Sequence, residues 1–218
     1  LDNDILAVFD PQKNKKFQHG EAIRWYVEDS ESGKAVGRIA AFYDKNGSDD
    51  YEQPTGGCGF FESIDDQQVA DMMFDACKQW LESKGMEAMD GPINFGSRDA
   101  WWGLLVEGYD YQPLYTNPYH PPYYKALFEN YGFQNYFNQN TYVWRAQDGV
   151  LSEIALEKAH RVLANPEYQI KDISNTNLEE AAENLRTIYN KAWALFTGVK
   201  EMTKEEAQTL MRTLRPII

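Results

Sequence analysis

The sequence is poor in cysteine and has no long apolar segment. Its only cysteines are Cys58 and Cys77, too few for a disulfide framework and without the spacing of a metal site, so we expect no bound metal. No stretch approaches the roughly 18 apolar residues that would span a membrane, and no signal-peptide pattern is present. We therefore expect a cytoplasmic protein that has no membrane partner.

Positive charge is also scarce. The chain has 21 Lys and Arg residues against 34 Asp and Glu residues, which gives a formal net charge of −13. Such a surface repels polyphosphate backbones, so DNA is not an expected partner. The phosphate-binding loop, the dinucleotide fingerprint, the nucleophile elbow and the zinc-binding helix are all missing. These absences remove the common nucleotide-dependent and metal-dependent enzyme classes from first consideration.

Apolar residues make up 43% of the chain, enough to build a real core. Residues 22–28 and 34–43 alternate in polarity and predict a β-hairpin, while 58–63 and 86–93 predict two further strands. Residues 66–84 predict an amphipathic helix that ends at a glycine. Its apolar residues recur at helical spacing: Val69, Met72, Met73, Ala76, Cys77, Trp80 and Leu81.

The segment 94–122 is rich in Trp, Tyr, Pro and Gly. A connection of this length inside a compact domain is usually functional. Its aromatic side chains fit two interpretations, the wall of a ligand pocket or the private core of a long loop. We expect residues 95–121 to cover the C-terminal ends of the central strands and to form one wall of the largest pocket. A helix over 122–131 and a strand over 134–145 are predicted to follow.

The pattern changes near residue 148. Helices are predicted over 151–163, 178–193 and 203–214, with a short strand over 168–173. The sequence therefore predicts a first domain over 1–147 and a mostly helical part over 148–218. The second part is interpreted either as a helical segment or as the start of a second, related half that continues past residue 218.

Residues 126–133 read Ala-Leu-Phe-Glu-Asn-Tyr-Gly-Phe, with Gly132 ending the helix. This ending, and the order of the elements before it, resemble the GNAT superfamily of acyl-CoA-dependent N-acyltransferases over residues 20–145. The resemblance implies an α+β fold with a mixed, mainly antiparallel sheet flanked by helices, and places the helices 66–84 and 122–131 on opposite faces. It also implies transfer of an acyl group from acyl-CoA to an amine of a small molecule or peptide.

Two positions depart from the family pattern. Phe128 stands where the family often has a tyrosine that protonates the departing thiolate. The family's pyrophosphate loop, Gln/Arg-x-x-Gly-x-Gly/Ala, falls on residues 65–70, where Asp65 and Gln68 replace the polar residue and the first glycine. Asp65 and Asp66 suit a helix start but repel phosphate. Acyl-CoA is therefore the cofactor that the resemblance implies, and the altered loop predicts that it binds weakly.

The resemblance also points to candidate site residues. The expected cofactor-binding residues are Gly59, Phe60, Phe61, Ser63, Gln67, Gln68 and Ala70. The candidates for proton transfer are Tyr124, Tyr123, His120 and Glu62. The expected substrate-binding residues are Asn94, Trp101 and Tyr119. A histidine between prolines equally fits a structural role.

Three functions remain open at this point. The first is an N-acyltransferase. The second is a degenerate, non-catalytic module of the same fold that acts in ligand binding or protein interaction. The third is a transferase that uses aminoacyl-tRNA, as tandem GNAT-like transferases do, and the acidic charge of this chain argues against it.

Overall fold

The computed structural model describes residues 2–48, 53–96, 100–143, 151–168, 173, 177–194, 196, 199 and 201–215. The chain divides into two compact units, Leu1–Tyr136 and Phe137–Ile218, and each is described by itself. The predicted boundary near residue 148 falls in a stretch outside the described residues, so it stays a prediction.

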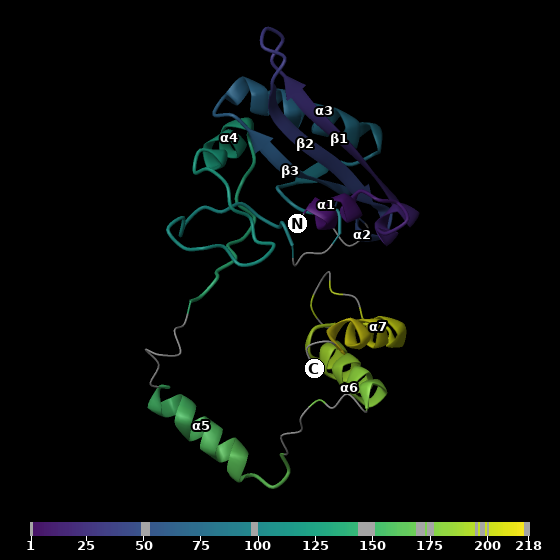
Figure 1. The fold of residues 1–218 in the computed structure, drawn as a ribbon, viewed down its shortest axis with the longest axis vertical. Coiled ribbons are helices and arrows are strands. Elements are labelled where there is room, and N and C mark those ends of the chain that lie inside the picture. Colours follow the sequence, from purple (N-terminus) through teal and green to yellow (C-terminus); the bar gives the residue numbers. More distant parts are fainter. Residues whose placement is uncertain are drawn as a thin grey trace. The chain divides into compact units, whose positions relative to one another are not determined.

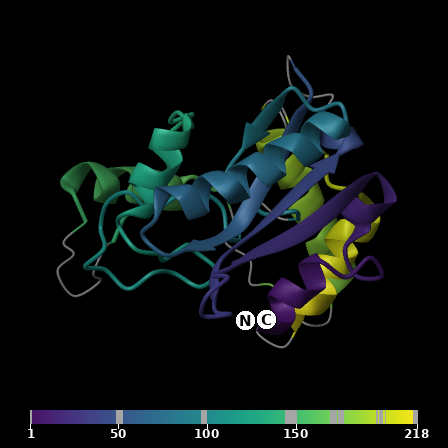
Figure 2. The same ribbon diagram turned by 90° about the horizontal axis from the view of Figure 1, so that it is seen from above.

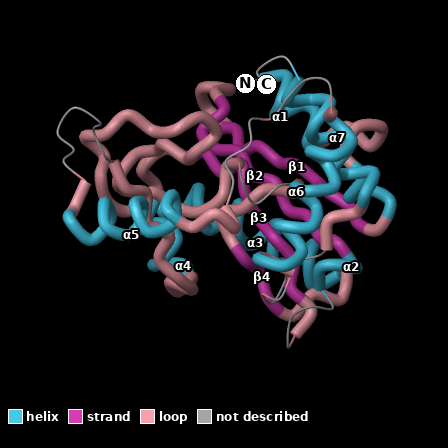
Figure 3. Tube along the Cα trace, turned by 90° about the horizontal axis from the view of Figure 1, so that it is seen from below, coloured by secondary structure: helices cyan, strands magenta, loops and turns pink. Residues whose placement is uncertain are grey.

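The first unit is built on one sheet of four strands. They are β1 (Gly20–Glu28), β2 (Ala35–Asp44), β3 (Thr55–Ser63) and β4 (Ala88–Asp90), and they lie in that order across the sheet. Figure 1 labels the first three strands, and Figure 3 labels all four. The first three are antiparallel, and β4 runs parallel to β3. The prediction of an α+β fold with a mixed, mainly antiparallel sheet is confirmed.

The hairpin between β1 and β2 is set by local turn chemistry. The Asp29 carboxylate accepts hydrogen bonds from the backbone N–H and the hydroxyl of Ser32, and Gly33 takes a left-handed φ of 66° that other residues rarely adopt. Along β2, residues 37 and 39–43 are all buried or partly buried. This strand is therefore the centre of the core, which explains its nearly continuous apolar sequence.

The helix α3 (Gln67–Ser83) covers one face of this sheet (Figure 2). Its buried residues, Ala70, Met73, Phe74, Cys77 and Leu81, pack against β2 and β3. The predicted stripe is therefore right in part: Ala70 and Phe74 belong to the buried face, and Met72 is 60% exposed. The helix gives way to Gly85, which has a φ of 82°. The helix predicted over 66–84 is confirmed.

The helix α4 (Tyr124–Tyr131) packs beside α3, in the same hydrophobic cluster. The rings of Phe74 and Phe128 lie 4.7 Å apart, and both contact Phe61 of β3. The expectation that the two helices lie on opposite faces is therefore wrong. The reason is chemical: the aromatic stripe of α4 finds its complement in the aromatic side chains of α3 and β3.

The opposite face of the sheet is covered by short N-terminal elements. These are α1 (Asp2–Val8) and the 3₁₀ helix η1 (Lys15–Gln18), while α2 (Lys45–Ser48) follows β2 directly. A second cluster forms there around Ala40, Phe42 and Phe95, packed by Phe9, Phe17 and Phe60. The core thus continues on both sides of β2.

One predicted strand does not form as expected. Residues 134–143 contain no strand, whereas a strand was predicted over 134–145, and the last two residues lie outside the described part. The stretch is rich in Asn and Gln, which fit sheets poorly, and Tyr136 and Tyr142 are exposed. The strand predicted over 168–173 stays a prediction, because residues 169–172 lie outside the described part of the chain.

The second unit contains helices α5 (Glu153–Ala164), α6 (Leu178–Ala192) and α7 (Lys204–Leu214), close to their predicted ranges. Helices α6 and α7 pack through Ala182, Ala207 and Met211. A capping box of Thr203 and Glu206 starts α7. In the described part of the chain, every helix is too short or too polar to cross a bilayer.

Candidate functional site

The strand β3 is distorted in its second half, where the site begins. Between the pairs Arg38–Glu62 and Ala40–Gly59, β3 contains one extra residue, a β-bulge, and Phe60 adopts a left-handed φ of 53°. Bulges of this kind bend a strand and separate it from its neighbour. On the other edge of β3, the pairing with β4 covers only residues 55–57. The rest of that edge is therefore left for other partners.

Two consecutive tyrosines occupy this edge of β3. The hydroxyl of Tyr123 donates a hydrogen bond to the carbonyl oxygen of Ser63 at 2.8 Å, and the hydroxyl of Tyr124 accepts one from the Ser63 N–H at 3.0 Å. The two phenols replace the hydrogen bonds that a neighbouring strand would make. We call this arrangement the tyrosine clamp. The Tyr123 hydroxyl already donates its hydrogen bond to Ser63, so of the two tyrosines only Tyr124 has a hydroxyl proton available to a ligand.

The imidazole of His120 stacks on the ring of Tyr124, with centroids 5.1 Å apart. Its Nε2 accepts a hydrogen bond from the Leu105 N–H at 3.1 Å. A neutral imidazole that accepts at Nε2 carries its proton on Nδ1, so Nδ1–H is a donor. Burial lowers the pKa of His120 below the usual value of 6.5, although nearby main-chain groups partly oppose the shift. His120 is therefore neutral at pH 7, and its lone pair is already used.

This geometry changes the role that the sequence suggested for His120. A general base needs a free lone pair, and the free edge of this ring carries a proton instead. Nδ1 is buried and makes no hydrogen bond of good geometry, although the main chain of His120 and Pro121 lies close to it. The Ser63 hydroxyl oxygen is also buried without a hydrogen-bond partner. Buried polar atoms of this kind call for a partner such as water or a ligand. The surroundings of Tyr124 thus contain two groups that a polar ligand can satisfy.

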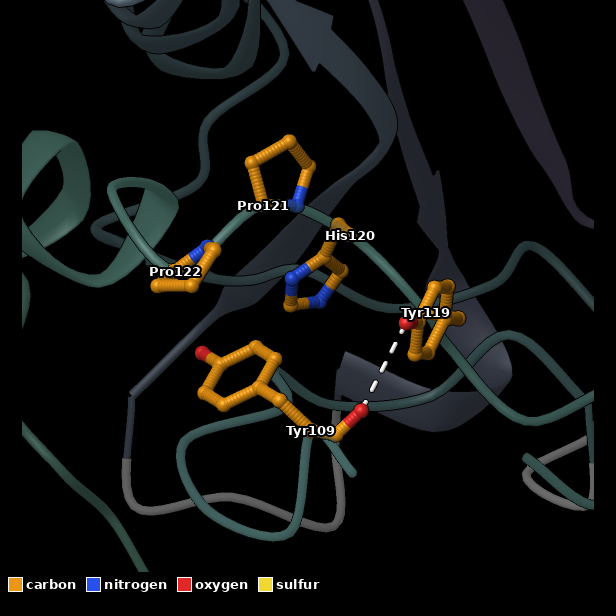
Figure 4. A pocket seen from close by; sticks show the side chains of 5 residues that line it. All are labelled: Tyr109, Tyr119, His120, Pro121 and Pro122. Carbon is orange, nitrogen blue, oxygen red and sulfur yellow. Dashed lines mark hydrogen bonds between the residues drawn. The ribbon is translucent and has the colours of Figure 1, made fainter. Parts of the chain in front are cut away.

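An open cavity of about 410 Å³ lies beside His120 (Figure 4). Its lining residues are Tyr109, Tyr119, His120, Pro121 and Pro122. Both tyrosine hydroxyls donate to backbone oxygens, Tyr109 to Leu105 at 2.6 Å and Tyr119 to Tyr109 at 3.5 Å. The cavity therefore presents ring faces and proline rings, with His120 as its polar group. Such walls suit an apolar ligand with few polar atoms.

The long loop between β4 and α4 supplies the residues that line this cavity. Figure 3 shows the stretch between β4 and α4 as a long loop beside the strands. Two contacts of Trp101 hold this loop. The Trp101 ring packs on Phe60 with ring centroids 6.1 Å apart, and its backbone N–H donates to the Thr116 carbonyl oxygen. The loop therefore lines a pocket and also packs on the sheet, so both interpretations of its aromatic residues apply.

The N-terminus of α3 does not offer a phosphate site. The Asp66 carboxylate accepts hydrogen bonds from the N–H groups of Gln68 and Val69, which are the donors that a phosphate would use. The Gln67 amide donates to Asp71 and to the Leu127 carbonyl, and so ties α3 to α4. These two N–H groups are therefore already bonded, and the carboxylate beside them repels a phosphate.

The other predicted site residues lie apart from the clamp. Glu62 points to the exposed side and pairs with Arg38 at 2.7 Å. Ala70 is fully buried on the inner side of α3. Phe60 contacts Phe9 and Trp101. Asn94 is buried and donates to the Ala100 carbonyl. Of the predicted set, the structure brings together Phe61, Ser63, His120, Tyr123, Tyr124 and Tyr119.

Sequence reasoning placed residues 95–121 at a pocket wall but did not single out several contributors to the site. Tyr109, Pro121 and Pro122 line the cavity, and the Leu105 N–H fixes the His120 tautomer. The aromatic and proline content of the loop was the available signal for the first three. A backbone donor leaves no signal in the sequence at all. Among the described residues, no group of three His, Cys, Asp or Glu side chains is placed to hold a metal ion.

Replacing His120 by glutamine is expected to change how stability depends on pH. In the native protein the folded pKa of His120 is lowered. Below pH 6.5 the unfolded chain therefore takes up a proton before the folded chain does, and stability is lost as the pH falls through this window. Glutamine keeps an acceptor for the Leu105 N–H but does not titrate. Urea unfolding at pH 7.5 and pH 5.5 should show a smaller pH-dependent loss for His120→Gln than for the native protein; equal losses would contradict a buried, neutral His120.

The sequence was also compared with known proteins. It is 29% identical over 187 residues to protein YghO of Escherichia coli (strain K12), covering 86% of this chain and 47% of that protein. It is 27% identical over 214 residues to the bacterial ceramide synthase of Caulobacter vibrioides (strain NA1000 / CB15N), covering 95% of this chain and 53% of that protein. The chain thus spans about half the length of the curated relatives it matches. No protein-family model matches the sequence, and no solved structure matches it.

Proposed function

We propose that this chain belongs to an acyltransferase that joins an acyl group to an amine, with its site at the tyrosine clamp. The observation that carries the proposal is the clamp itself: Tyr124 bonds to the end of the distorted strand β3, and its ring stacks on the neutral His120, which lines an apolar cavity. The relative named bacterial ceramide synthase supports it. A ceramide is a fatty amide of a long-chain amino alcohol, so the reaction that its name describes forms an amide bond.

The clamp can supply the proton chemistry of this transfer. The amine nitrogen attacks the acyl carbon of a thioester, the C–N bond forms, the C–S bond breaks, and the amine proton leaves to water. The Nδ1–H of His120 is a donor for the acyl oxygen as it gains negative charge. The Tyr124 hydroxyl is the donor for the departing thiolate, and burial keeps it protonated by raising the pKa of Tyr124. Tyr124 would thus replace the tyrosine that is missing at Phe128.

The acyl donor is held without phosphate contacts at the start of α3. We therefore expect acetyl-CoA to bind more weakly than about 1 µM, with an affinity close to that of a short thioester that lacks the nucleotide. Calorimetric titration of both ligands measures this directly. Asp66→Asn keeps the capping acceptor and should leave acetyl-CoA binding weak, whereas Asp66→Gly frees two N–H groups and should strengthen it. A submicromolar dissociation constant for the native chain would contradict the blocked phosphate site.

A direct assay tests the function. The protein is incubated with a long-chain 2-amino alcohol and a palmitoyl thioester, and the amide is detected by mass spectrometry. We expect an amide that does not form in the absence of protein. If the chain, assayed by itself, forms no amide with either long-chain or short acceptors, the proposal is rejected for it.

A binding module without chemistry of its own is the second candidate. The buried Phe128 at the family's tyrosine position and the carboxylate at the start of α3 favour it. A module of this kind would bind the acyl thioester, seen as a change in tryptophan emission, and form no amide. The assay above and a fluorescence titration together separate the two candidates.

A further inference from the structure

The loop around the cavity exposes large apolar side chains to solvent. Val106, Tyr111, Leu114, Tyr115 and Tyr119 are between 45% and 75% exposed. Leu114 and Tyr115 stand next to each other near the middle of this stretch, and Tyr119 belongs both to the exposed set and to the lining of the cavity. We call residues 106–119 the aromatic rim. Single exposed apolar residues are normal in proteins, but a group of them within one loop, of which one also lines a cavity, marks an interaction surface.

The rim has an unusual charge pattern for a surface loop. Between residues 100 and 123 the chain has no Lys or Arg, and its only charged residues are Glu107 and Asp110. Tyrosine, tryptophan, leucine and proline fill most of the remaining positions. Tyr and Trp are the residues that concentrate at the boundary between lipid and water, where the ring is buried and the polar atom stays wet. A nucleic acid or a strongly acidic protein finds no cation here to bind.

We infer that the aromatic rim docks the chain on the surface of a neutral, zwitterionic lipid bilayer, with the cavity opening toward it. The inference rests on the proposed function in one respect, because a long-chain amine or its amide resides in bilayers and has to reach the cavity from there. The net charge of −13 excludes attraction to anionic lipid, so apolar contact has to supply the affinity. The inference differs from the sequence-based expectation that the chain has no membrane partner.

Vesicle flotation tests this with a matched pair of variants. The rim variant carries Leu114→Ser and Tyr115→Ser. The control carries Tyr26→Ser and Met72→Ser, which change equally exposed apolar residues on β1 and α3. The native chain and the control should float with phosphatidylcholine vesicles alike, and the rim variant should bind about tenfold more weakly or worse, since each of the two side chains loses its apolar burial.

Several results would overturn the inference. Native protein that stays unbound at all lipid concentrations would do so, as would a rim variant that floats like the control, or binding that requires anionic lipid. Self-association through the rim in place of vesicle binding, seen by sedimentation, would assign the surface to a protein partner. A parallel assay with a short, water-soluble amine separates bilayer docking from the proposed function. The rim variant should form the amide of this amine at the native rate, because Leu114 and Tyr115 lie outside the cavity lining.

Discussion

Replacing Phe74 by alanine is expected to lower the free energy of unfolding by about 3–5 kcal/mol. The side chain is fully buried on α3, and its ring lies 4.7–5.2 Å from those of Phe61, Phe128, Tyr131 and Phe133. Truncation therefore removes contacts with β3, with α4 and with Phe133 just beyond α4. The cavity that remains has few flexible neighbours able to fill it, so little of the loss is recovered.

Urea unfolding, followed by tryptophan emission, measures this effect. Met72→Ala is the matched control, because it truncates a neighbouring residue of the same helix that is 60% exposed. We expect that control to change the free energy of unfolding by less than about 0.5 kcal/mol. A loss below about 1 kcal/mol for Phe74→Ala would mean that α3 and α4 do not share one aromatic cluster. It would contradict the placement of α4 beside α3.

Replacing Tyr124 by phenylalanine is expected to lower the rate of amide formation by about 100-fold or more, which is the usual effect of losing a general acid. The ring and its stacking on His120 remain, so the acyl site keeps its shape. The Ser63 N–H loses its acceptor, and this should lower the free energy of unfolding by about 1–3 kcal/mol. The rate and the stability therefore report on the same hydroxyl in two different ways.

Tyr131→Phe is the matched control for Tyr124→Phe. Its hydroxyl also sits on α4, but it donates to Asp75 on the surface of α3, away from the clamp. We expect its kcat to stay within about twofold of the native value, as for a substitution outside the site. Tyr124→Phe with native kcat, or equal losses for the two variants, would remove the proton-donor role from Tyr124.

The elements that the sequence predicted best are those whose pattern is local. The stripe of α3 repeats over several turns and ends at Gly85, so its periodicity and its stop signal agree. The β1–β2 hairpin is similar, because the Asp29 turn and the alternating strands are adjacent in the chain. The Asp66 cap follows from the preference of helix starts for Asp. In each case the relevant contacts lie within a few residues or within one periodic stretch.

The errors come from contacts between distant segments. Nothing near residues 124–131 says which face of the sheet α4 covers, because the choice depends on Phe61 and Phe74, which lie more than 50 residues away. The strand predicted over 134–145 needed a partner strand, and its Asn-rich sequence finds none in the described part. The tyrosine clamp joins Tyr123 and Tyr124 to a backbone group 60 residues earlier. Motif matching could place these tyrosines near the site but not assign their protons.

The most direct test of the site is the nuclear magnetic resonance signal of the Ser63 amide during titration with a short acyl thioester that lacks the nucleotide. In the proposed site the ligand lies against Tyr124 and His120. The Ser63 amide and the His120 Nδ1–H should therefore shift together as the ligand binds, while the amides of Gln68 and Val69 at the start of α3 stay in place. Shifts confined to the start of α3, or binding with no change at Ser63, would contradict the tyrosine clamp as the acyl site.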